Sequence, residues 1–439
     1  TFIAPVLNYG ILAPILIVLG GALIGVLVEA FAPRKSRSSS QLFIAVLTLV
    51  IALAALLRTR GVYSTKAAMS SVTFDGAGFL LQGSILVISL IAILLLADSD
   101  KFAAAPTAVP GSDEERQAQA ANIRVTEIYP LTLFAIAGML LFPVATDLIT
   151  LFVALEVLSL PLYLMAGLAR RRRLASQEAA LKYFLLGAFA SAFFLFGVAY
   201  LYGYSDSITF AGIASAISGG SANDVFLLIG ISFVSVGLLF KVGAVPFHSW
   251  TPDVYQGSPT SVTIFLSTVP KIAAVALLVR LLIDGLGNFQ QYWADLFMIL
   301  AVLSIAVGSL VALTQVNIKR MLAYSTISHV GFVLLGFMTG VLEGYGSAVF
   351  YVLAYILMSL AAFGSIIALN RNGFEADQVS DFKGLSKHSP WFALIMLVVM
   401  LSMAGVPPFI GFYSKLFILQ QVIFEGYVIL AVVAVIFAV

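Results

Sequence analysis

Long apolar segments recur along the whole chain, and no other feature restricts its possible folds so strongly. A membrane-spanning helix needs about 20 apolar residues. Hydrocarbon offers an open backbone no hydrogen-bond partner, so each span must be helical. The sequence therefore predicts an all-α polytopic membrane protein with about 13–14 transmembrane helices. Runs of this kind fall at about 9–32, 41–57, 76–97, 126–145, 148–169, 178–203, 224–247, 259–283, 292–314, 320–341, 344–370, 390–424 and 425–439.

Composition supports the membrane class and excludes several kinds of site. Of the 439 residues 61% are hydrophobic and only 10% are charged, whereas a soluble domain carries about 25% charged residues. Cysteine is absent, which excludes disulfides, iron–sulfur clusters and thiolate metal sites within this chain. The three histidines lie far apart and show no metal-ligand spacing. The net charge is +2, and the basic residues form no patch for nucleic acid.

Lys and Arg divide unevenly between alternate loops. Loops on the cytoplasmic side of membrane proteins are enriched in these residues. Placing the N-terminus outside leaves only Arg58, Arg60 and Lys66 in outside loops, so we predict an external N-terminus. The fifteen residues assigned to the inside are Arg34, Lys35, Arg37, Lys101, Arg116, Arg124, Arg170, Arg171, Arg172, Arg173, Lys319, Arg320, Arg371, Lys383 and Lys387.

Two loops are long, and neither is large enough to be a domain. Residues 98–125 are polar and Pro/Ala-rich, which predicts a surface excursion, and residues 204–223 contain an apolar stretch that fits a short interfacial helix. Thr1 is not a methionine and Val439 lies inside an apolar run. We therefore expect both ends to be trimmed and a further span to follow Val439.

Ionisable side chains lie inside several spans, where a charge at the bilayer centre costs roughly 2.5–3.5 kcal/mol. Such groups must face the interior of the bundle and find partners or water. Glu156 lies in the middle of the fifth span. It fits either a protonated acid that joins helices or a protonatable site that balances a buried lysine. Lys182 follows Glu178 by one helical turn, which leaves open an interfacial salt bridge and a role in transport.

The stretch 234–280 combines buried charge with proline. Pro246 follows Lys241 closely, so the helix must break near that lysine, and broken helices expose carbonyl groups that can hold water or cations. His248 follows the break, and Lys271 follows Pro270 in the next span. A lone histidine is often only an interior hydrogen-bonding group. Between two buried lysines we interpret this one as a proton carrier, since its ordinary pKa is near neutral.

Two later spans also carry ionisable groups. His329 lies on a hydroxyl-rich segment, YSTISH, and fits either helix–helix hydrogen bonding or a hydrated relay. Lys415 lies in a span that Pro407 and Pro408 break. A lysine also sits beside the break in GAVPF at 243–247, and corresponding broken helices indicate inverted repeats. Arg280 and Asp284, one turn apart, we interpret as a structural pair.

The repeats divide the chain into three predicted parts. Residues 1–125 form an N-terminal three-helix segment with its polar loop. Residues 126–283 hold the first five-helix repeat, spans four to eight. Residues 284–439 hold the second, spans nine to thirteen.

Three segments carry a family resemblance. The run KVGAVPFHSWTPDVYQGSPTSVTIFLSTVPK at 241–271 resembles the signature of the antiporter-like membrane subunits of respiratory complex I. NIKRMLAYSTISHVG at 317–331 and MAGVPPFIGFYSKLF at 403–417 are similar to the same family. The form TPDVYQG, followed by a proline–lysine pair, resembles the N-type subunits most closely. The similarity covers about residues 126–425, and the first three spans fit the bacterial form.

The resemblance implies a function and a set of partners. A member of this family is a membrane-arm subunit of a proton-pumping NADH:quinone oxidoreductase in the bacterial inner membrane, beside other antiporter-like and small membrane subunits. FMN, iron–sulfur clusters and quinone are expected in partner subunits, with no cofactor in this chain. Two alternatives stay open: a cation/proton antiporter subunit without redox coupling, and a scaffold whose buried charges only lock helix packing.

The family's proton-channel residues can be placed on this sequence one by one. They fall on Glu156, Lys182, Lys241, His248, Lys271 and Lys415, and we add His329 from the hydroxyl-rich span. The implied mechanism separates an ion pair of Glu156 with Lys241. The proton then passes through His248 and water to Lys271, and Lys415 exchanges with the outside.

Overall fold

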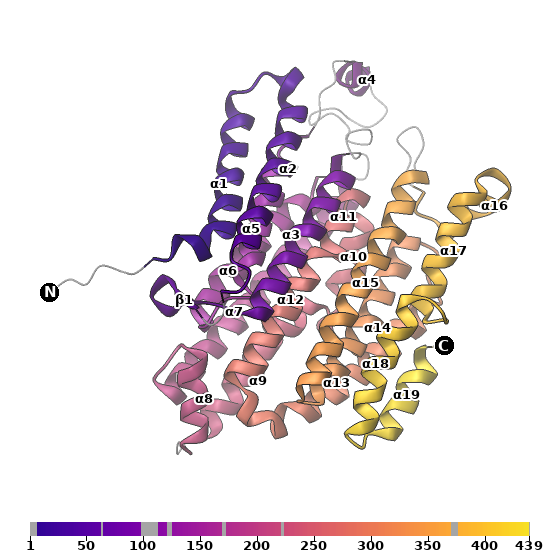
Figure 1. The fold of residues 1–439 in the computed structure, drawn as a ribbon. Helices are drawn as coiled ribbons and strands as arrows, with labels where there is room; N and C mark the ends of the chain where they lie inside the picture. The colour runs from indigo at the N-terminus through magenta and orange to yellow at the C-terminus, as the bar shows by residue number, and fades with distance from the viewer. Residues whose placement is uncertain are drawn as a thin grey trace.

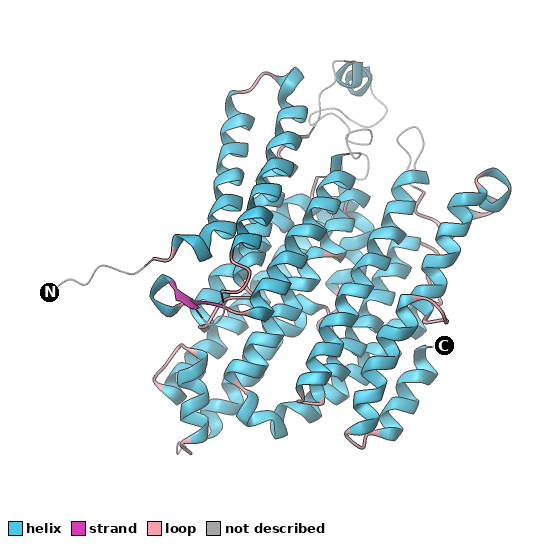
Figure 2. Ribbon diagram, in the orientation of Figure 1, coloured by secondary structure: helices cyan, strands magenta, loops and turns pink. Residues whose placement is uncertain are grey.

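The protein forms a bundle of roughly parallel helices in the computed structural model, which describes residues 7–62, 65–97, 113–120, 125–168, 173–220, 224–369 and 376–438. The indigo N-terminal helices lie on one side and the yellow C-terminal helices on the other (Figure 1). Figure 2 shows helix almost throughout, apart from one small antiparallel hairpin, β1 (Thr65–Ala67) with β2 (Val72–Phe74). This confirms the all-α class.

The helices follow the predicted spans. In the described ranges ten segments are long and apolar enough to cross a membrane, and shorter apolar helices account for the remaining runs. The long ones are α1 (Tyr9–Phe31), α2 (Arg34–Arg58), α3 (Gly76–Ala97), α6 (Leu148–Ala166), α7 (Arg173–Ser205), α9 (Asp224–Val242), α11 (Thr260–Ser267) continued by α12 (Val269–Val279), α13 (Gln290–Ala312), α14 (Ile318–Met338) and α15 (Leu342–Leu369). The shorter ones are α5 (Ile128–Leu141), α17 (Pro390–Ala404), α18 (Ile410–Phe424) and α19 (Val428–Ala438).

Short helices fill the connections. They are α4 (Asp113–Ala120), α8 (Phe210–Ser218), α10 (Trp250–Gly257) and α16 (Leu385–His388), with 3₁₀ turns at Ala68–Ser70, Gly287–Phe289 and Val379–Phe382. The helix expected in the 204–223 loop is α8, capped by the Thr209 hydroxyl, which accepts from the Gly212 amide. Most of the 98–125 loop lies outside the described residues, as do Lys101, Arg124, Arg170, Arg171, Arg172 and Arg371.

The predicted helix breaks are present and share one backbone conformation. α9 ends at Val242 and α17 ends at Ala404. The next residue is in each case a glycine, Gly243 or Gly405, with φ of +86°. Glycine adopts this left-handed region without a steric penalty, so it allows a helix to stop sharply inside the bundle.

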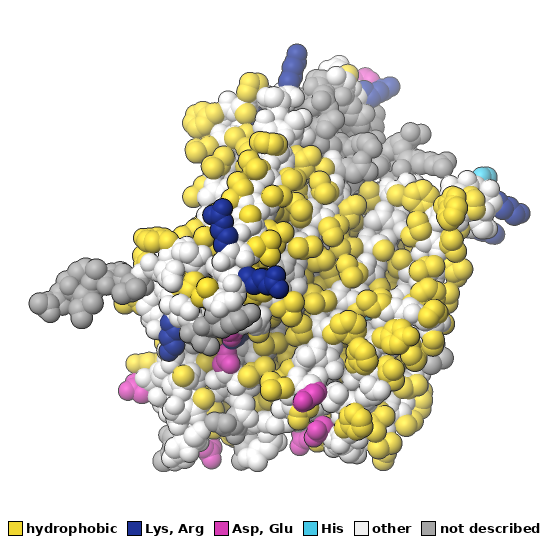
Figure 3. Space-filling view, viewed as in Figure 1, with side chains coloured by type: hydrophobic (Ala, Val, Ile, Leu, Met, Phe, Trp, Pro, Cys, Tyr) yellow, Lys and Arg dark blue, Asp and Glu magenta, His cyan; other side chains and the backbone are white. Residues whose placement is uncertain are grey.

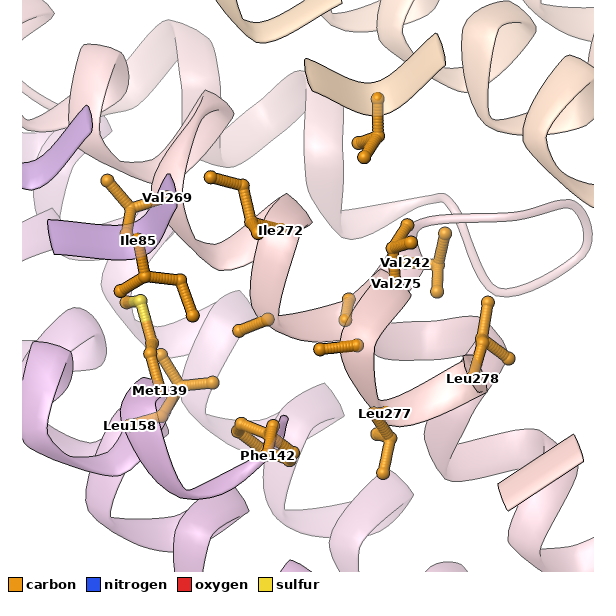
Figure 4. Packing of buried hydrophobic residues seen from close by; sticks show 14 of the residues in the cluster. Ile85, Met139, Phe142, Leu158, Val242, Val269, Ile272, Val275, Leu277 and Leu278 are labelled. Carbon is orange, nitrogen blue, oxygen red and sulfur yellow. The ribbon is translucent and has the colours of Figure 1, made fainter. Parts of the chain in front are cut away.

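Helix α12 is fully enclosed, because every residue from Val269 to Val279 is buried. A helix that is hydrophobic on all sides belongs in the interior. Figure 4 shows Ile272 of α12 on the side of Ile85 of α3, and Val275 of α12 beside Val242 of α9. Lys271 belongs to this helix, so its side chain lies in the interior of the bundle.

A cluster around Arg280 fixes the end of α12, where a π-helical turn spans Arg280–Gly285. The guanidinium binds both carboxylate oxygens of Asp75, at 2.8 and 2.7 Å, and donates to the Pro143 carbonyl at 2.6 Å. Its bond to Asp284, at 3.1 Å, confirms the predicted pair. Sequence spacing could not reveal Asp75, which lies 205 residues away.

Candidate functional site

Lys241 lies in the last turn of α9 and is 4% exposed. Its ammonium donates to the Ser159 hydroxyl of α6 at 2.8 Å and lies 5.7 Å from the centre of the Tyr183 ring. The Ser159 hydroxyl itself donates to the Leu155 carbonyl. The lysine is therefore held against α6 by a neutral acceptor.

Glu156 occupies the same helix, one turn before Ser159. Its Oε1 atom is buried and has no hydrogen-bond partner. No ion pair within 4.0 Å joins Glu156 to Lys241, so the expected direct ion pair is wrong for this conformation. Glu156 and Ser159 lie three residues apart and therefore share one face of α6. On that face Lys241 bonds to Ser159 rather than to Glu156. Burying an unpaired carboxylate oxygen is costly, which suits a group that binds a proton or a water molecule during function.

His248 lies in the turn between α9 and α10 and is half-buried. Two bonds hold the segment around it: the Trp250 indole donates to the Phe240 carbonyl at 2.9 Å, and the Val245 amide donates to the Ser304 hydroxyl at 3.0 Å. The Nδ1 atom of His248 is buried without a partner. This turn therefore presents a ring nitrogen that is free to exchange a proton.

Lys271 is 3% exposed and donates its ammonium proton to the Val242 carbonyl, the last of α9. Carbonyl groups at a helix C-terminus lack partners within the helix, so the lysine caps the broken end. It also lies 5.6 Å from the centre of the Trp250 ring. A Cβ atom on Gly243 would lie 3.3 Å from the Lys271 Nζ atom, so the glycine keeps room for the ammonium group.

Lys415 repeats this arrangement in the second half of the chain. Its Nζ atom donates to the Ala404 carbonyl, the last of α17, at 2.8 Å. A Cβ atom on Gly405 would lie 2.9 Å from the Lys415 Cδ atom. From the sequence we paired the first break with Lys241. The geometry pairs Lys271 with Lys415 instead, because each caps a helix that ends before a left-handed glycine.

His329 of α14 is buried, and its Nδ1 atom lies 2.7 Å from the Tyr351 hydroxyl of α15. A second bond, 2.6 Å between the Thr326 and Tyr355 hydroxyls, joins the same two helices. His329 and Lys271 line one cavity together with these three residues and five valines. The cavity leaves about 10 Å³ for the centre of a water-sized sphere, which is roughly what one water molecule needs.

Lys182 takes part in a separate ionic network near one end of the bundle. Its ammonium lies 2.6 Å from Glu178 and 2.7 Å from Asp253, and Arg320 lies 2.6 Å from Asp253. The predicted pair with Glu178 is confirmed. In the described part of the chain, Lys182 shares no hydrogen bond or ion pair with Glu156, Lys241 or Lys271. Burial opposes ionisation of Asp253, but bonds from Lys182 and Arg320 outweigh it and lower the pKa of Asp253.

Sequence reasoning missed several polar groups of the interior. Lys319 and Arg320 were assigned to an inside loop, but both lie in the first turn of α14. Lys319 is fully buried and donates to the Ser258 carbonyl at 2.8 Å. The signal that could have found them is Asn317, whose side chain caps α14 at the Arg320 amide. Helix caps of this type mark a helix start in the sequence.

The arrangement brings together groups that can exchange protons. Buried lysine, histidine, serine and tyrosine groups lie on α6, α9, α12, α14 and α15 and on the turn after α9. Two of them, Lys271 and His329, share a cavity of water size. Within the described ranges, no group of three or more His, Asp or Glu side chains could hold a metal ion.

Curated relatives are similar to the whole chain. A family model described as NADH:quinone oxidoreductase/Mrp antiporter, TM, matches residues 145–439. The protein named NADH-quinone oxidoreductase subunit N from Rhodococcus opacus is 45% identical over 99% of this chain and 85% of that relative. The protein of the same name from Ruthia magnifica is 59% identical over 70% of this chain, and the match spans only 64% of that relative.

Solved structures agree with the fold. A chain of respiratory complex I from Thermus thermophilus with bound aureothin is 32% identical, with a TM-score of 0.74 and coverage of 97% of this chain and 86% of that one. A chain of the Mrp complex from Dietzia is 24% identical, with a TM-score of 0.78 and coverage of 97% and 77%. The second likeness shows the shared fold alone.

Proposed function

The chain belongs to the family of NADH-quinone oxidoreductase N subunits, and from that premise we propose that it moves protons across the bacterial inner membrane. The observation that carries the proposal is the cavity that joins Lys271 to His329 deep in the bundle. The other antiporter-like and small membrane subunits of the oxidoreductase are its partners. FMN, the iron–sulfur clusters and quinone belong to partner subunits, and the N-terminus faces outside.

The proposed route begins at the broken end of α9. Lys241, held by Ser159, gives its proton through water to the open ring nitrogen of His248. His248 gives it to Lys271, whose ammonium then caps the Val242 carbonyl. Glu156 controls the first step, because its unpartnered oxygen can attract the Lys241 charge when water enters between them.

The second half of the route crosses the cavity. Lys271 releases a proton to one water molecule and becomes a neutral amine, and the water passes a proton to the His329 ring. An Nδ1–H group that donates to the Tyr351 hydroxyl oxygen leaves Nε2 unprotonated, so Nε2 is the nitrogen that accepts this proton. Lys415 receives the proton next and exchanges with the outside. Lys182, half-exposed beside Asp253, stands at the entrance on the inner side.

The test is proton pumping by the reconstituted oxidoreductase with Lys271→Met in this chain. We expect loss of NADH-driven acidification in sealed vesicles, because the uncharged side chain can neither cap Val242 nor carry a proton. Lys383→Met, an exposed loop lysine, is the matched control. Undiminished pumping by an assembled Lys271→Met complex contradicts the proposal. Purification of the chain without flavin, iron–sulfur centres or NADH oxidation favours an antiporter subunit without redox coupling.

A further inference from the structure

An apolar groove runs along the outer face of the bundle, where α2 and α3 meet α15. Its volume is about 370 Å³. Its walls are Leu53, Leu56, Leu57, Phe79, Leu80, Gly83, Ser84, Val87, Ile88, Leu353 and Leu357. The one hydroxyl among them, on Ser84, already donates to the Leu80 carbonyl of its own helix. The groove therefore offers nothing to a polar ligand and suits a saturated hydrocarbon chain.

Small residues on α3 create the groove, and its length suits one leaflet of a membrane. Gly83 and Ser84 leave a gap opposite Leu56, which a Cβ atom on Gly83 would approach to 3.6 Å. Phe79 and Ile88, the first and last wall residues on α3, are separated by ~14 Å at 1.5 Å per residue. Half of a hydrocarbon core of about 30 Å is ~15 Å. The length of the groove thus matches the thickness of one leaflet of the hydrocarbon core, which one acyl chain spans.

Positive charge gathers where the groove reaches the end of α2. Leu57 lines the groove and Arg58 follows it as the last residue of the helix. The Arg60 amide donates to the Leu57 carbonyl at 3.3 Å, so the chain turns once more and places Arg60 above Leu57. Both arginines are exposed, and neither forms an ion pair with a carboxylate of the described residues. Figure 3 shows Lys and Arg side chains bordering this apolar face.

The position of these charges is unusual for the chain. Arg58, Arg60 and Lys66 are the only Lys and Arg residues that the sequence assigns to outside loops. Arg58 ends α2, and the other two lie in the connection between α2 and α3. The enrichment of Lys and Arg on the cytoplasmic side disfavours such a cluster outside. Arg58 also complements the C-terminal end of the α2 dipole, but that reason does not extend to Arg60. A negatively charged ligand at the groove accounts for both arginines.

We propose that the groove formed by α2, α3 and α15 binds one acyl chain of an anionic phospholipid of the outer leaflet, whose phosphate lies on Arg58 and Arg60. A basic site at the end of an apolar groove is the combination that an acidic lipid requires. The bound lipid joins the N-terminal three-helix segment to α15, in the second half of the chain. Neither the groove nor these arginines takes part in the proposed proton route.

The test uses the intact oxidoreductase in vesicles that contain a phosphatidylglycerol with a photoactivatable group on its acyl chain. We expect cross-links to peptides of α2, α3 and α15. Arg58→Gln with Arg60→Gln lowers their yield by roughly tenfold, since each basic residue contributes to anionic lipid binding. Gly83→Leu, which fills the groove, abolishes cross-linking to α3.

Matched controls separate the groove from the general membrane surface. Arg34→Gln with Lys35→Gln removes two exposed charges from the other end of α2. Gly20→Leu adds the same side chain on α1, where the glycine has no neighbour within 4 Å. Neither control lowers the yield. The proposal fails if phosphatidylcholine carrying the same group labels equally, if Gly83→Leu leaves labelling unchanged, or if a helix of a partner subunit fills the groove.

Discussion

The hydroxyl of Ser159 accepts a hydrogen bond from the ammonium of Lys241, and this contact is one of the interactions that stabilise the buried lysine. A buried hydrogen bond to a charged group contributes about 1.5–3 kcal/mol. Ser159 therefore competes with Glu156 for the same cation, although sequence reasoning gave the contact to the glutamate. The serine carried no signal, because serine hydroxyls within spans ordinarily bond to their own helix.

Ser159→Ala removes this neutral acceptor. We expect proton pumping to fall about threefold to tenfold, because the freed ammonium moves toward Glu156 and holds its proton there more tightly. The measurement is the ratio of proton flux to NADH oxidation in vesicles. Ser365→Ala is the control, since that hydroxyl likewise bonds one turn back, to Ala361, and contacts no lysine. Equal flux ratios for the two variants would show that Ser159 has no part in transfer.

Asp253 offers a second test at the level of a single residue. Asp253→Asn removes the carboxylate shared by Lys182 and Arg320, and we expect a loss of about 1–2 kcal/mol at pH 7, reduced by partial exposure. The pKa of Asp253 lies lower in the folded state. Its stabilisation is therefore complete above the unfolded pKa of about 3.9 and disappears as pH falls through the folded pKa.

The measurement is the difference in thermal unfolding midpoint between the wild type and Asp253→Asn across this pH range. Asp295→Asn, an exposed carboxyl on α13, should leave the midpoint unchanged at every pH. A difference that grows on acidification would contradict the assignment.

At the scale of elements, each broken helix depends on a pair of residues, a left-handed glycine and a lysine that caps the exposed carbonyl. Proline in the sequence predicted both breaks correctly, because it cannot continue a helix. The capping lysine was not predictable for α9, since Lys271 comes from another helix and lies 29 residues from Val242. Local sequence determines where a helix stops, but only packing determines which side chain satisfies its end.

Gly405→Ala tests this pairing. We expect pumping to fall about tenfold, because a Cβ atom lies too close to the Lys415 side chain, in addition to a backbone cost of about 1–2 kcal/mol. Gly426→Ala is the matched control, with φ of +87° and no neighbour within 4 Å. It carries the same backbone cost without a lysine. If both variants pump equally, backbone strain alone explains the effect and the lysine cap is unimportant.

For the whole molecule, the sequence predicted the class, the order of spans and most of their ends, because membrane insertion imposes length and hydrophobicity directly. The division into residues 1–125, 126–283 and 284–439 stays a prediction. Contacts between distant segments were beyond reach, as Asp75 with Arg280 shows. One carboxylate near the start of α3 and one guanidinium at the end of α12 join the N-terminal segment to the predicted first repeat.

Asp75→Asn weakens this junction. We expect a loss of about 2–3 kcal/mol in unfolding free energy, because Arg280 stays almost fully buried with only the more exposed Asp284 as an anionic partner. The measurement is thermal or denaturant unfolding of the purified complex. Asp284→Asn should cost less than about 1 kcal/mol. The opposite ranking of the two variants would refute the assignment of Asp75 as the main partner.

The cavity between Lys271 and His329 has a consequence for energy conservation. In the proposed route, a passage with room for about one water molecule conducts protons only while that molecule is in place. Such a contact has two states, one that conducts protons and one that does not. A pump built around it loses little of its stored gradient at rest, because back-flow of protons stops whenever one molecule leaves.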